Sequence, residues 1–262
     1  MKKLQNTISK FISRVIPPLV AVAVIIALWQ WLSVSGIMPS FMMPSPLNVW
    51  NAFLEDFFIL CDHGAATLQE AFLGLSIGLG ISFVIATLMD ACKPLNRGIY
   101  PLLVVSQTIP SVAIAPLLLL WFGYGIFPKV VLIVITTFFP ITVGLIDGFA
   151  SADKDALNLL RSMGAGPVKR YLYIKLPSAL GYFFSGLKIS VSYSVVGAVI
   201  SEWLGGTRGL GVYMTRVRKS FSYDRMFAVI LFIAAVSLLL MLLVMFIKWL
   251  IMPWERKVNK HA

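Results

Sequence analysis

Two apolar stretches of this 262-residue chain contain polar side chains that could recognise a small solute. The stretch at 99–122 holds hydroxyl and amide groups beside Pro110 and Pro116, and the stretch at 178–200 holds a lysine among hydroxyls. Polar groups inside apolar segments are costly, so they tend to face a cavity or another polar group. The chemistry open to them is hydrogen bonding and charge pairing. The candidate recognition residues are Ser106, Gln107, Thr108, Ser111, Lys188, Ser192, Tyr193 and Glu202.

Each of these groups also has a structural alternative. Pro110 and Pro116 could interrupt a helix to build a binding site, or they could mark a kink whose freed backbone groups are satisfied by nearby hydroxyls. Lys188 could neutralise an anionic solute, pair with Asp147, or extend toward water. Glu202 could cap a gate or simply meet water. The sequence leaves these alternatives open.

No pattern in the sequence predicts bond-making chemistry, a metal site or a bound nucleotide. The chain lacks G-x-x-x-x-G-K-[ST], the phosphate-binding loop of ATPases. The segment LGGTRGLG at 204–211 is rich in glycine, but no Lys-Ser or Lys-Thr follows it, and a turn that needs positive φ explains its glycines better. His63 and His261 lack metal-ligand spacing, and Cys61 and Cys92 fall in predicted loops on opposite sides of a membrane. We therefore expect no catalytic residue, disulfide, metal or cofactor in this chain.

The elements that position these groups are predicted to be transmembrane helices. The chain is 59% hydrophobic and 13% charged, with a mean hydropathy of +0.88, which is too apolar to cover a soluble fold. No alternating strand pattern is present, so backbone satisfaction in lipid requires helices. The sequence predicts an all-α integral membrane protein whose six spans run about 16–34, 68–89, 99–122, 128–146, 178–200 and 226–251.

The distribution of Lys and Arg predicts that both termini lie in the cytoplasm. Positive charges concentrate on cytoplasmic loops. Here they gather in the N-terminal tail, in the loop at 151–177 and at the C-terminal end, whereas 34–67 has none. This arrangement also explains the net charge of +11, so nucleic-acid binding is not expected. The first span could be a cleaved signal peptide, but it is long and no cleavage site follows it, so we expect it to be retained.

One basic segment does not follow the charge rule. The segment between Glu202 and Arg225 is predicted to lie outside, yet it carries several cations. They could dock an acidic extracellular partner through electrostatic steering, or they could belong to a solvated loop. The outside stretch before the second span is predicted to hold an interfacial amphipathic helix from about Pro46. The candidate docking residues are Arg208, Arg216, Arg218 and Lys219.

The loop between the fourth and fifth spans has the pattern of a compact helix–turn–helix. Residues 153–163 carry an apolar face at i, i+3, i+4 and i+7. Gly164 is a helix stop, and Pro167 suits the first turn of a second short helix that runs toward Lys175 before the next span begins. An apolar face with a cationic rim fits a groove on a soluble partner, whereas the alternative is a basic loop with incidental helicity. The face comprises Ala156, Leu159, Leu160 and Met163.

The spacing in this loop resembles the EAA loop of bacterial ABC importer permeases. That loop has the pattern E-A-A-x-x-x-G, nine residues, then I-x-L-P, and here nine residues separate Gly164 from Ile174-x-Leu176-Pro177. In the first half Asn158-Leu159-Leu160 replaces Glu-Ala-Ala, so no charge pair is carried over to that position. Three further stretches resemble the nitrate/sulfonate/taurine-type branch, and the likeness covers roughly 67–249. They are QTIPSVAIAPLLLLWFGYG at 107–125, FFPITVGLIDG at 138–148 and SEWLGGTRGLGVYM at 201–214.

The resemblance implies the type I importer permease fold, with six transmembrane helices and a cytoplasmic coupling helix between the fourth and fifth. Two permease subunits, expected to be identical, would enclose the path, and two separate ATPase chains would bind ATP and Mg. An extracellular or periplasmic binding protein would deliver the substrate. The implied ATPase-coupling residues are Asn158, Leu159, Leu160, Arg161, Ser162, Met163, Gly164, Ala165, Val168, Ile174, Leu176 and Pro177.

The implied location is the bacterial cytoplasmic (inner) membrane. Residues 1–66 would form the N-terminal tail, the first helix and the outside helix, residues 67–252 the permease core, and residues 253–262 a cytoplasmic tail. Three short segments are most similar in sequence to permeases for pyrimidine precursors of thiamine, namely MDACKP, SQTIPSVAIAPLL and AVISEWLGG. We therefore favour a small heterocyclic nutrient over nitrate, aliphatic sulfonates or taurine as the substrate.

Two other functions stay open at this stage. An ion-gradient-driven secondary transporter would need carboxylates buried within its spans, but Asp90, Asp147 and Glu202 are all predicted to lie at span ends. By the same reasoning, Lys188 is predicted to be the sole Lys or Arg well inside a span. A membrane scaffold that recruits a soluble enzyme would also use the cytoplasmic loop. Co-purification with an ATPase would separate these functions from an importer.

Overall fold

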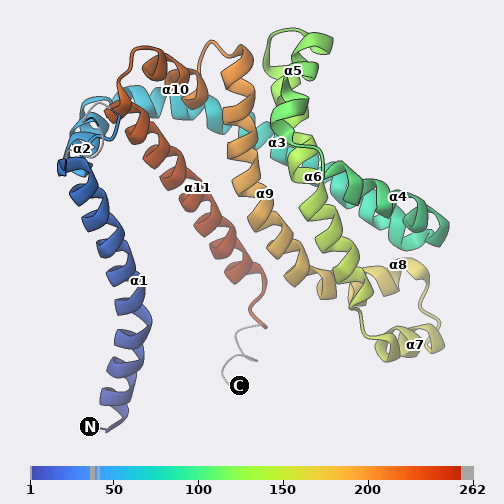
Figure 1. Ribbon diagram of the computed structural model, residues 1–262. Helices are drawn as coiled ribbons and strands as arrows, with labels where there is room; N and C mark the ends of the chain where they lie inside the picture. The colour runs from blue at the N-terminus through green and yellow to red at the C-terminus, as the bar shows by residue number, and fades with distance from the viewer. Residues whose placement is uncertain (1, 36–38, 40–41, 255–262) are drawn as a thin grey trace. The chain divides into compact units, whose positions relative to one another are not determined.

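The computed structural model describes residues 2–35, 39 and 42–254, with the backbone alone for 2–15. Every regular element in this described part is a helix (Figure 1). The predicted tail cations Arg256, Lys257 and Lys260, together with His261, lie outside the described residues. The helices are α1 (Lys2–Val34), α2 (Pro46–Glu55), α3 (Phe57–Ala91), α4 (Lys93–Ser106), α5 (Ser111–Phe122), α6 (Ile126–Ala150), α7 (Lys154–Ser162), α8 (Pro167–Arg170), a π-helix (Tyr171–Lys175), α9 (Leu176–Gly205), α10 (Leu210–Lys219) and α11 (Tyr223–Ile251).

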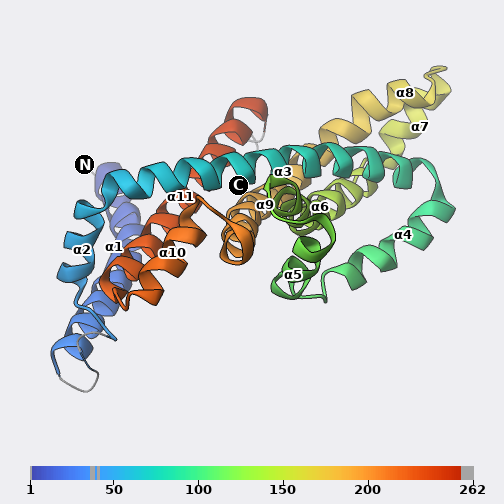
Figure 2. The ribbon, with the colours of Figure 1, turned by 90° about the horizontal axis from the view of Figure 1, so that it is seen from above.

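The structure has five helices long and apolar enough to cross a membrane among the described residues. They are Ile16–Val34 within α1, α3, α6, the continuous helix Pro167–Gly205, and α11. The predicted third span is instead a pair of helices, α4 and α5, bent by 98°, and six crossings result if this pair counts as one. Figure 2 shows α4 leaving the end of α3 and α5 following it at the bend. Pro110 explains the break, because it lacks an N–H and disfavours helical conformation at Ile109.

The chain forms two compact units, and the predicted boundary at residue 66 falls within α3. The smaller unit comprises residues 1–60 and 214–231. In it α2 begins as predicted at Pro46, where the Ser45 side chain caps the helix. Its exposed side carries Leu47, Trp50 and Leu54, which suits an interfacial helix. Its buried side packs within a cluster of Trp29, Val49, Ala52, Phe53, Phe227 and Ala228.

The larger unit comprises residues 61–213 and 232–262 and is organised around α6 and α9. These two helices lie side by side along much of their length (Figure 1). Small residues allow this close approach. A Cβ atom at Gly144 would lie 2.8 Å from the carbonyl oxygen of Tyr182, and one at Gly186 would overlap the carbonyl of Pro140. The Ser190 hydroxyl also donates a hydrogen bond of 2.8 Å to the Thr137 carbonyl, so α6 and α9 act as one packed pair.

Two sequence predictions about local structure are wrong. The second short helix of the loop does not end before the next span, because α8 runs through the π-helix directly into α9. Pro177 follows the π-helix directly, where the Leu176 N–H bonds to the Tyr171 carbonyl five residues back, so it lies next to a local departure from the regular helical hydrogen-bond pattern. Cys61 lies inside α3 rather than in a loop, and Cys92 follows the end of the same helix. About 31 residues of helix hold these two exposed thiols roughly 45 Å apart, so they cannot pair with each other.

Candidate functional site

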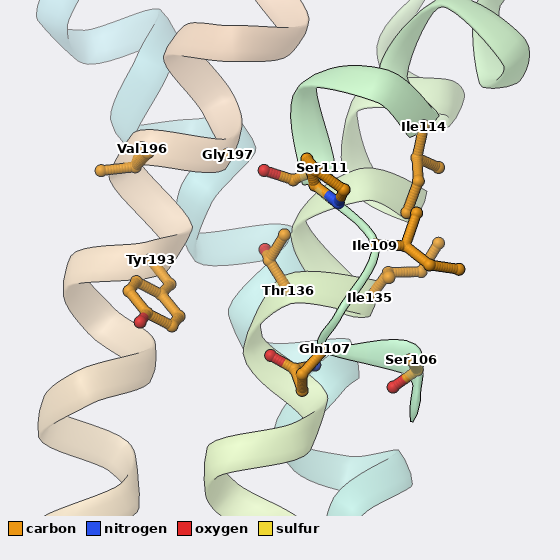
Figure 3. Close-up of a pocket in the computed structure, with 11 residues that line it drawn as sticks. Ser106, Gln107, Ile109, Ser111, Ile114, Ile135, Thr136, Tyr193, Val196 and Gly197 are labelled. Atoms are coloured by element: carbon orange, nitrogen blue, oxygen red, sulfur yellow. The ribbon is translucent and has the colours of Figure 1, made fainter. Parts of the chain in front are cut away.

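The break between α4 and α5 forms one wall of a cavity of about 210 Å³, here called the break cavity (Figure 3). The other walls are α6 and α9. Figure 3 shows Gln107, Ser111 and Thr136 on one side, with the Tyr193 ring projecting from α9 opposite them. The wall therefore offers an amide, hydroxyls, a phenol and apolar carbon. The lining residues are Ser106, Gln107, Ile109, Pro110, Ser111, Ile114, Ile135, Thr136, Tyr193, Val196 and Gly197.

A second cavity of about 410 Å³ adjoins the first, since Gln107 and Tyr193 line both. It follows α6 and α9 as far as Asp147 and Tyr182, nearer to α7 along the chain. No Lys or Arg among the described residues lines either cavity. The two cavities together form a groove with neutral hydrogen-bonding groups and one carboxylate.

The structure gathers about half of the predicted recognition residues at this groove. Ser106, Gln107, Ser111 and Tyr193 line it. Thr108 also lies at the break, but its hydroxyl donates to the Val105 carbonyl and it does not line either cavity. The half-buried Lys188 and Ser192 line neither cavity.

Sequence analysis missed the contribution of α6 to this groove. Thr136 lines the break cavity and Asp147 the adjoining one. The hydroxyl pair Thr136-Thr137 in an otherwise apolar run was the available signal. Nothing in that run indicated which of the two hydroxyls faces the cavity. The answer depends on the packing of α6 against α9.

Glu202 lies apart from this groove and is buried, with 1% of its surface exposed. Its carboxylate accepts hydrogen bonds from the Thr67 hydroxyl at 2.7 Å and from the Gly211 N–H at 2.6 Å. The alternative that it simply meets water is therefore wrong. The neighbouring backbone is held by α3 as well, because Gly209 N–H donates to Nδ1 of His63 at 3.0 Å.

The glycines at 204–211 serve this packing around Glu202. Gly209 has φ +133°, and a Cβ atom there would overlap the Glu202 carboxylate. At Gly211 a Cβ atom would overlap the carbonyl of Val199. The expected positive-φ turn is thus present, and close approach to a buried carboxylate adds a second reason for glycine.

A buried ion pair joins α3 to α6, and sequence analysis missed it. Lys129 Nζ lies 2.6 Å from Oε1 of Glu70, and both side chains are less than a tenth exposed. The prediction that no carboxylate is buried mid-span is wrong, because Glu70 is buried within α3. Lys129 is the fourth residue of α6. Opposite charges 59 residues apart can neutralise each other only in the folded bundle, so local spacing does not reveal them.

The predicted coupling loop forms an elbow, here defined as residues 153–175, next to the end of α6 (Figure 1). The Asp153 side chain caps α7 by accepting from the N–H of Asp155 at 2.9 Å, and Gly164 with φ +77° follows its end. The part of the elbow before the π-helix exposes three large apolar side chains, namely Leu159 at 63%, Met163 at 72% and Val168 at 69%, and the π-helix exposes Leu172 and Tyr173 as well.

The other predicted coupling residues lie along the same segment. Asn158, Arg161 and Ser162 are exposed on α7, while Leu160 and Ala165 are half-buried. Ile174 lies in the π-helix, and Leu176 and Pro177 open α9. The second half of the signature therefore belongs to the helix that continues into the bundle.

The candidate docking cations differ in their environment. In the larger unit, Arg208 Nε donates to Oδ2 of Asp62 at 3.0 Å. In the smaller unit, Arg216, Arg218 and Lys219 are exposed in the last turn of α10.

Comparison with known proteins agrees with this arrangement. The family model described as "Binding-protein-dependent transport system inner membrane component" matches residues 76–257. A probable ABC transporter permease protein of Haemophilus influenzae is 37% identical over 87% of this chain and 93% of its own length. The formylaminopyrimidine transport permease protein ThiX of Halalkalibacterium halodurans is 35% identical over 89% of this chain and 93% of its own.

A solved structure supports the fold. The crystal structure of an amino acid ABC transporter with histidines matches with a TM-score of 0.60 and 21% identity, covering 78% of this chain and 96% of that one. The predicted resemblance is confirmed, and so is the all-α membrane fold of a type I permease. The chain belongs to the family of binding-protein-dependent transport system inner membrane components and is a permease subunit of an ABC importer.

Proposed function

We propose that this permease subunit forms half of the path for a small neutral heterocycle, with a pyrimidine precursor of thiamine as the leading candidate. The observation that carries the proposal is the groove at the α4–α5 break. Its walls offer the Gln107 amide, the Ser111 and Thr136 hydroxyls and the Tyr193 ring. An amide and hydroxyls can match the ring nitrogens and amino groups of a heterocycle, and an aromatic ring can stack on its face.

The composition of the groove weighs against nitrate, sulfonates and taurine. An anion that leaves water needs a cation or several directed N–H donors to replace its hydration. Among the described residues the groove offers no Lys or Arg, and its one ionisable acid is Asp147. The 35% identity to a relative named for formylaminopyrimidine transport supports the same choice.

Transport would be driven through the elbow. The exposed Leu159, Met163 and Val168 would seat in a groove on a separate ATPase chain, which would bind ATP and Mg. Nucleotide would then bias the permease between two states through differential contacts. This chain would contribute no nucleotide site, since its sequence lacks the phosphate-binding motif.

The remaining partners follow from the same proposal. A second permease subunit, which we take to be identical, would complete the groove, and two ATPase chains would bind the two elbows. Arg208, Arg216, Arg218 and Lys219 would dock the binding protein outside. Both termini would lie in the cytoplasm. Family membership is what favours this importer over a secondary transporter, because Glu70 removes the earlier argument from missing buried carboxylates.

The test is uptake into proteoliposomes that contain the permease, its ATPase and its binding protein. We expect ATP-dependent uptake of formylaminopyrimidine, unaffected by excess nitrate or taurine. Tyr193→Leu should raise the half-saturating concentration about tenfold, the scale of one lost ring contact. Thr108→Ala serves as the control, because Thr108 lies at the break without lining the groove. ATP-dependent nitrate uptake without heterocycle uptake would refute the proposed substrate.

A further inference from the structure

The end of α3 is tied to the elbow by a pair of contacts one helical turn apart. Lys175 Nζ donates to both carboxylate oxygens of Asp90, at 2.8 and 2.7 Å. The Thr87 hydroxyl and the Tyr171 hydroxyl lie 2.8 Å apart. All four residues are in the larger unit, and Lys175 and Asp90 are 27% and 18% exposed. A half-buried ion pair with two hydrogen bonds is better defined in geometry than an exposed one.

Both contacts fall on the π-helix, which is the last part of the elbow before α9. Tyr171 opens this element and Lys175 closes it. A π turn within a longer helix is a local departure from regular geometry and often marks a functional position. Lys175 also occupies the variable position of Ile174-x-Leu176-Pro177, so the resemblance assigns it no role.

Tyr171, which makes one of these contacts, also packs against a buried apolar cluster that extends to α4. Phe149 packs against the Tyr171 ring, with centroids 5.3 Å apart. The cluster joins the end of α3 to α4 through Met89 and Leu103. The α4 helix ends at Ser106, which lines the break cavity. A continuous set of packed residues thus runs from the elbow to the α4–α5 break.

We propose that the Asp90–Lys175 pair is a positioning pair that transmits nucleotide-driven movement of the elbow to α3 and, through the cluster, to α4. The proposal rests on the proposed seating of the elbow on the ATPase. Because Lys175 is covalently continuous with α9, the elbow moves α9 directly. The ion pair is what makes α3 follow.

The experiment uses the full chain bound to its ATPase in lipid nanodiscs. Cys92→Ser leaves native Cys61, which is exposed near the other end of α3, as the reporter. The rate at which a maleimide labels Cys61 is measured without nucleotide and with ATP and vanadate. We expect this rate to differ at least about fivefold between the two states in the parent complex, the lower end of ordinary coupling between sites.

The variants separate coupling from folding. Asp90→Asn and Lys175→Met should each reduce the nucleotide effect to under about twofold while the ATPase stays bound. The exchange Asp90→Lys with Lys175→Asp should restore it. Lys93→Met, which removes an exposed cation at the start of α4, should leave the effect unchanged.

The outcomes are distinct. A full nucleotide effect in Asp90→Asn, or none in the parent complex with ATPase bound, would overturn this inference and leave the proposed function standing. If no ATPase co-purified with the parent chain, the seating of the elbow would be refuted and this inference with it.

Discussion

Glu202 shows how one buried carboxylate determines the residues around it. Its oxygens are satisfied by Thr67 and by the backbone of Gly211, so the first turn of α10 must lie within hydrogen-bonding distance of the carboxylate. Only glycine fits at position 211, because a Cβ atom there would overlap the Val199 carbonyl. A glycine-rich sequence that could suggest phosphate binding thus has a packing explanation.

Gly211→Ala tests this explanation. The added methyl would overlap the Val199 carbonyl and lie 2.9 Å from Cβ of Glu202, so the start of α10 must shift. Overpacking of this kind costs about 1–3 kcal/mol. We expect the melting temperature of the purified permease to fall by roughly 3–10 °C on that scale. Gly80→Ala is the matched control, because no atom lies within 4 Å of its added methyl, and an equal loss in both variants would contradict the explanation.

The Glu70–Lys129 pair makes a second prediction at this scale. Lys129→Met leaves a buried carboxylate without its cation, and removal of one partner of a buried pair costs about 3–5 kcal/mol. We expect poor recovery of this variant from membranes and a lower melting temperature. The double variant Glu70→Leu with Lys129→Met removes both charges and should recover most of the loss. Wild-type stability of Lys129→Met alone would show that the pair is not a structural requirement.

Among the helices, the elbow carries the most direct prediction. Leu159→Asp with Met163→Asp places two charges on the exposed apolar face of α7 without disturbing a buried contact. If this face binds the ATPase, co-purification of the two chains should fall at least tenfold, which corresponds to about 1.4 kcal/mol. Lys154→Asp, exposed at the start of the same helix and outside the predicted coupling residues, controls for the same change of two charge units. Retention of the ATPase by the double variant would contradict the assignment.

The same helices show which features a sequence can reveal. The stop at Gly164 and the apolar period of α7 are local, and both were predicted correctly. The sharp bend at Pro110 was foreseen only as an interruption, because its angle depends on how α5 packs against α6. The π-helix is even harder to predict from the sequence, since nothing in the residues at 171–175 departs from an ordinary helical pattern.

The candidate site divides in the same way. Polar residues in the interrupted third span pointed to the groove, because hydroxyls and amides in an apolar run are conspicuous. Lys188 was equally conspicuous, yet it lines neither cavity of the groove. The contributions of Thr136 and Asp147, and the charge pairing of Glu70, required the packing of α3, α6 and α9.

For the whole molecule, the central prediction is its orientation in the membrane. In cells that lack the native thiols through Cys61→Ser and Cys92→Ser, Ser162→Cys on the elbow should resist a membrane-impermeant maleimide until the membrane is opened. Lys169→Cys should behave in the same way. Arg218→Cys should be labelled in intact cells. Labelling of the elbow from outside would place it on the wrong side for an ATPase and would refute the proposed mechanism.

The unbroken helix Pro167–Gly205 has a geometric consequence for transport. About 26 residues, or roughly 39 Å of axis, separate its first residue from Tyr193 at the groove. A tilt of about five degrees at the first turn would therefore shift the Tyr193 ring by roughly 3 Å, the length of one hydrogen bond. A small tilt of this helix at its contact with an ATPase would therefore be enough to break the contact between the Tyr193 ring and a bound solute.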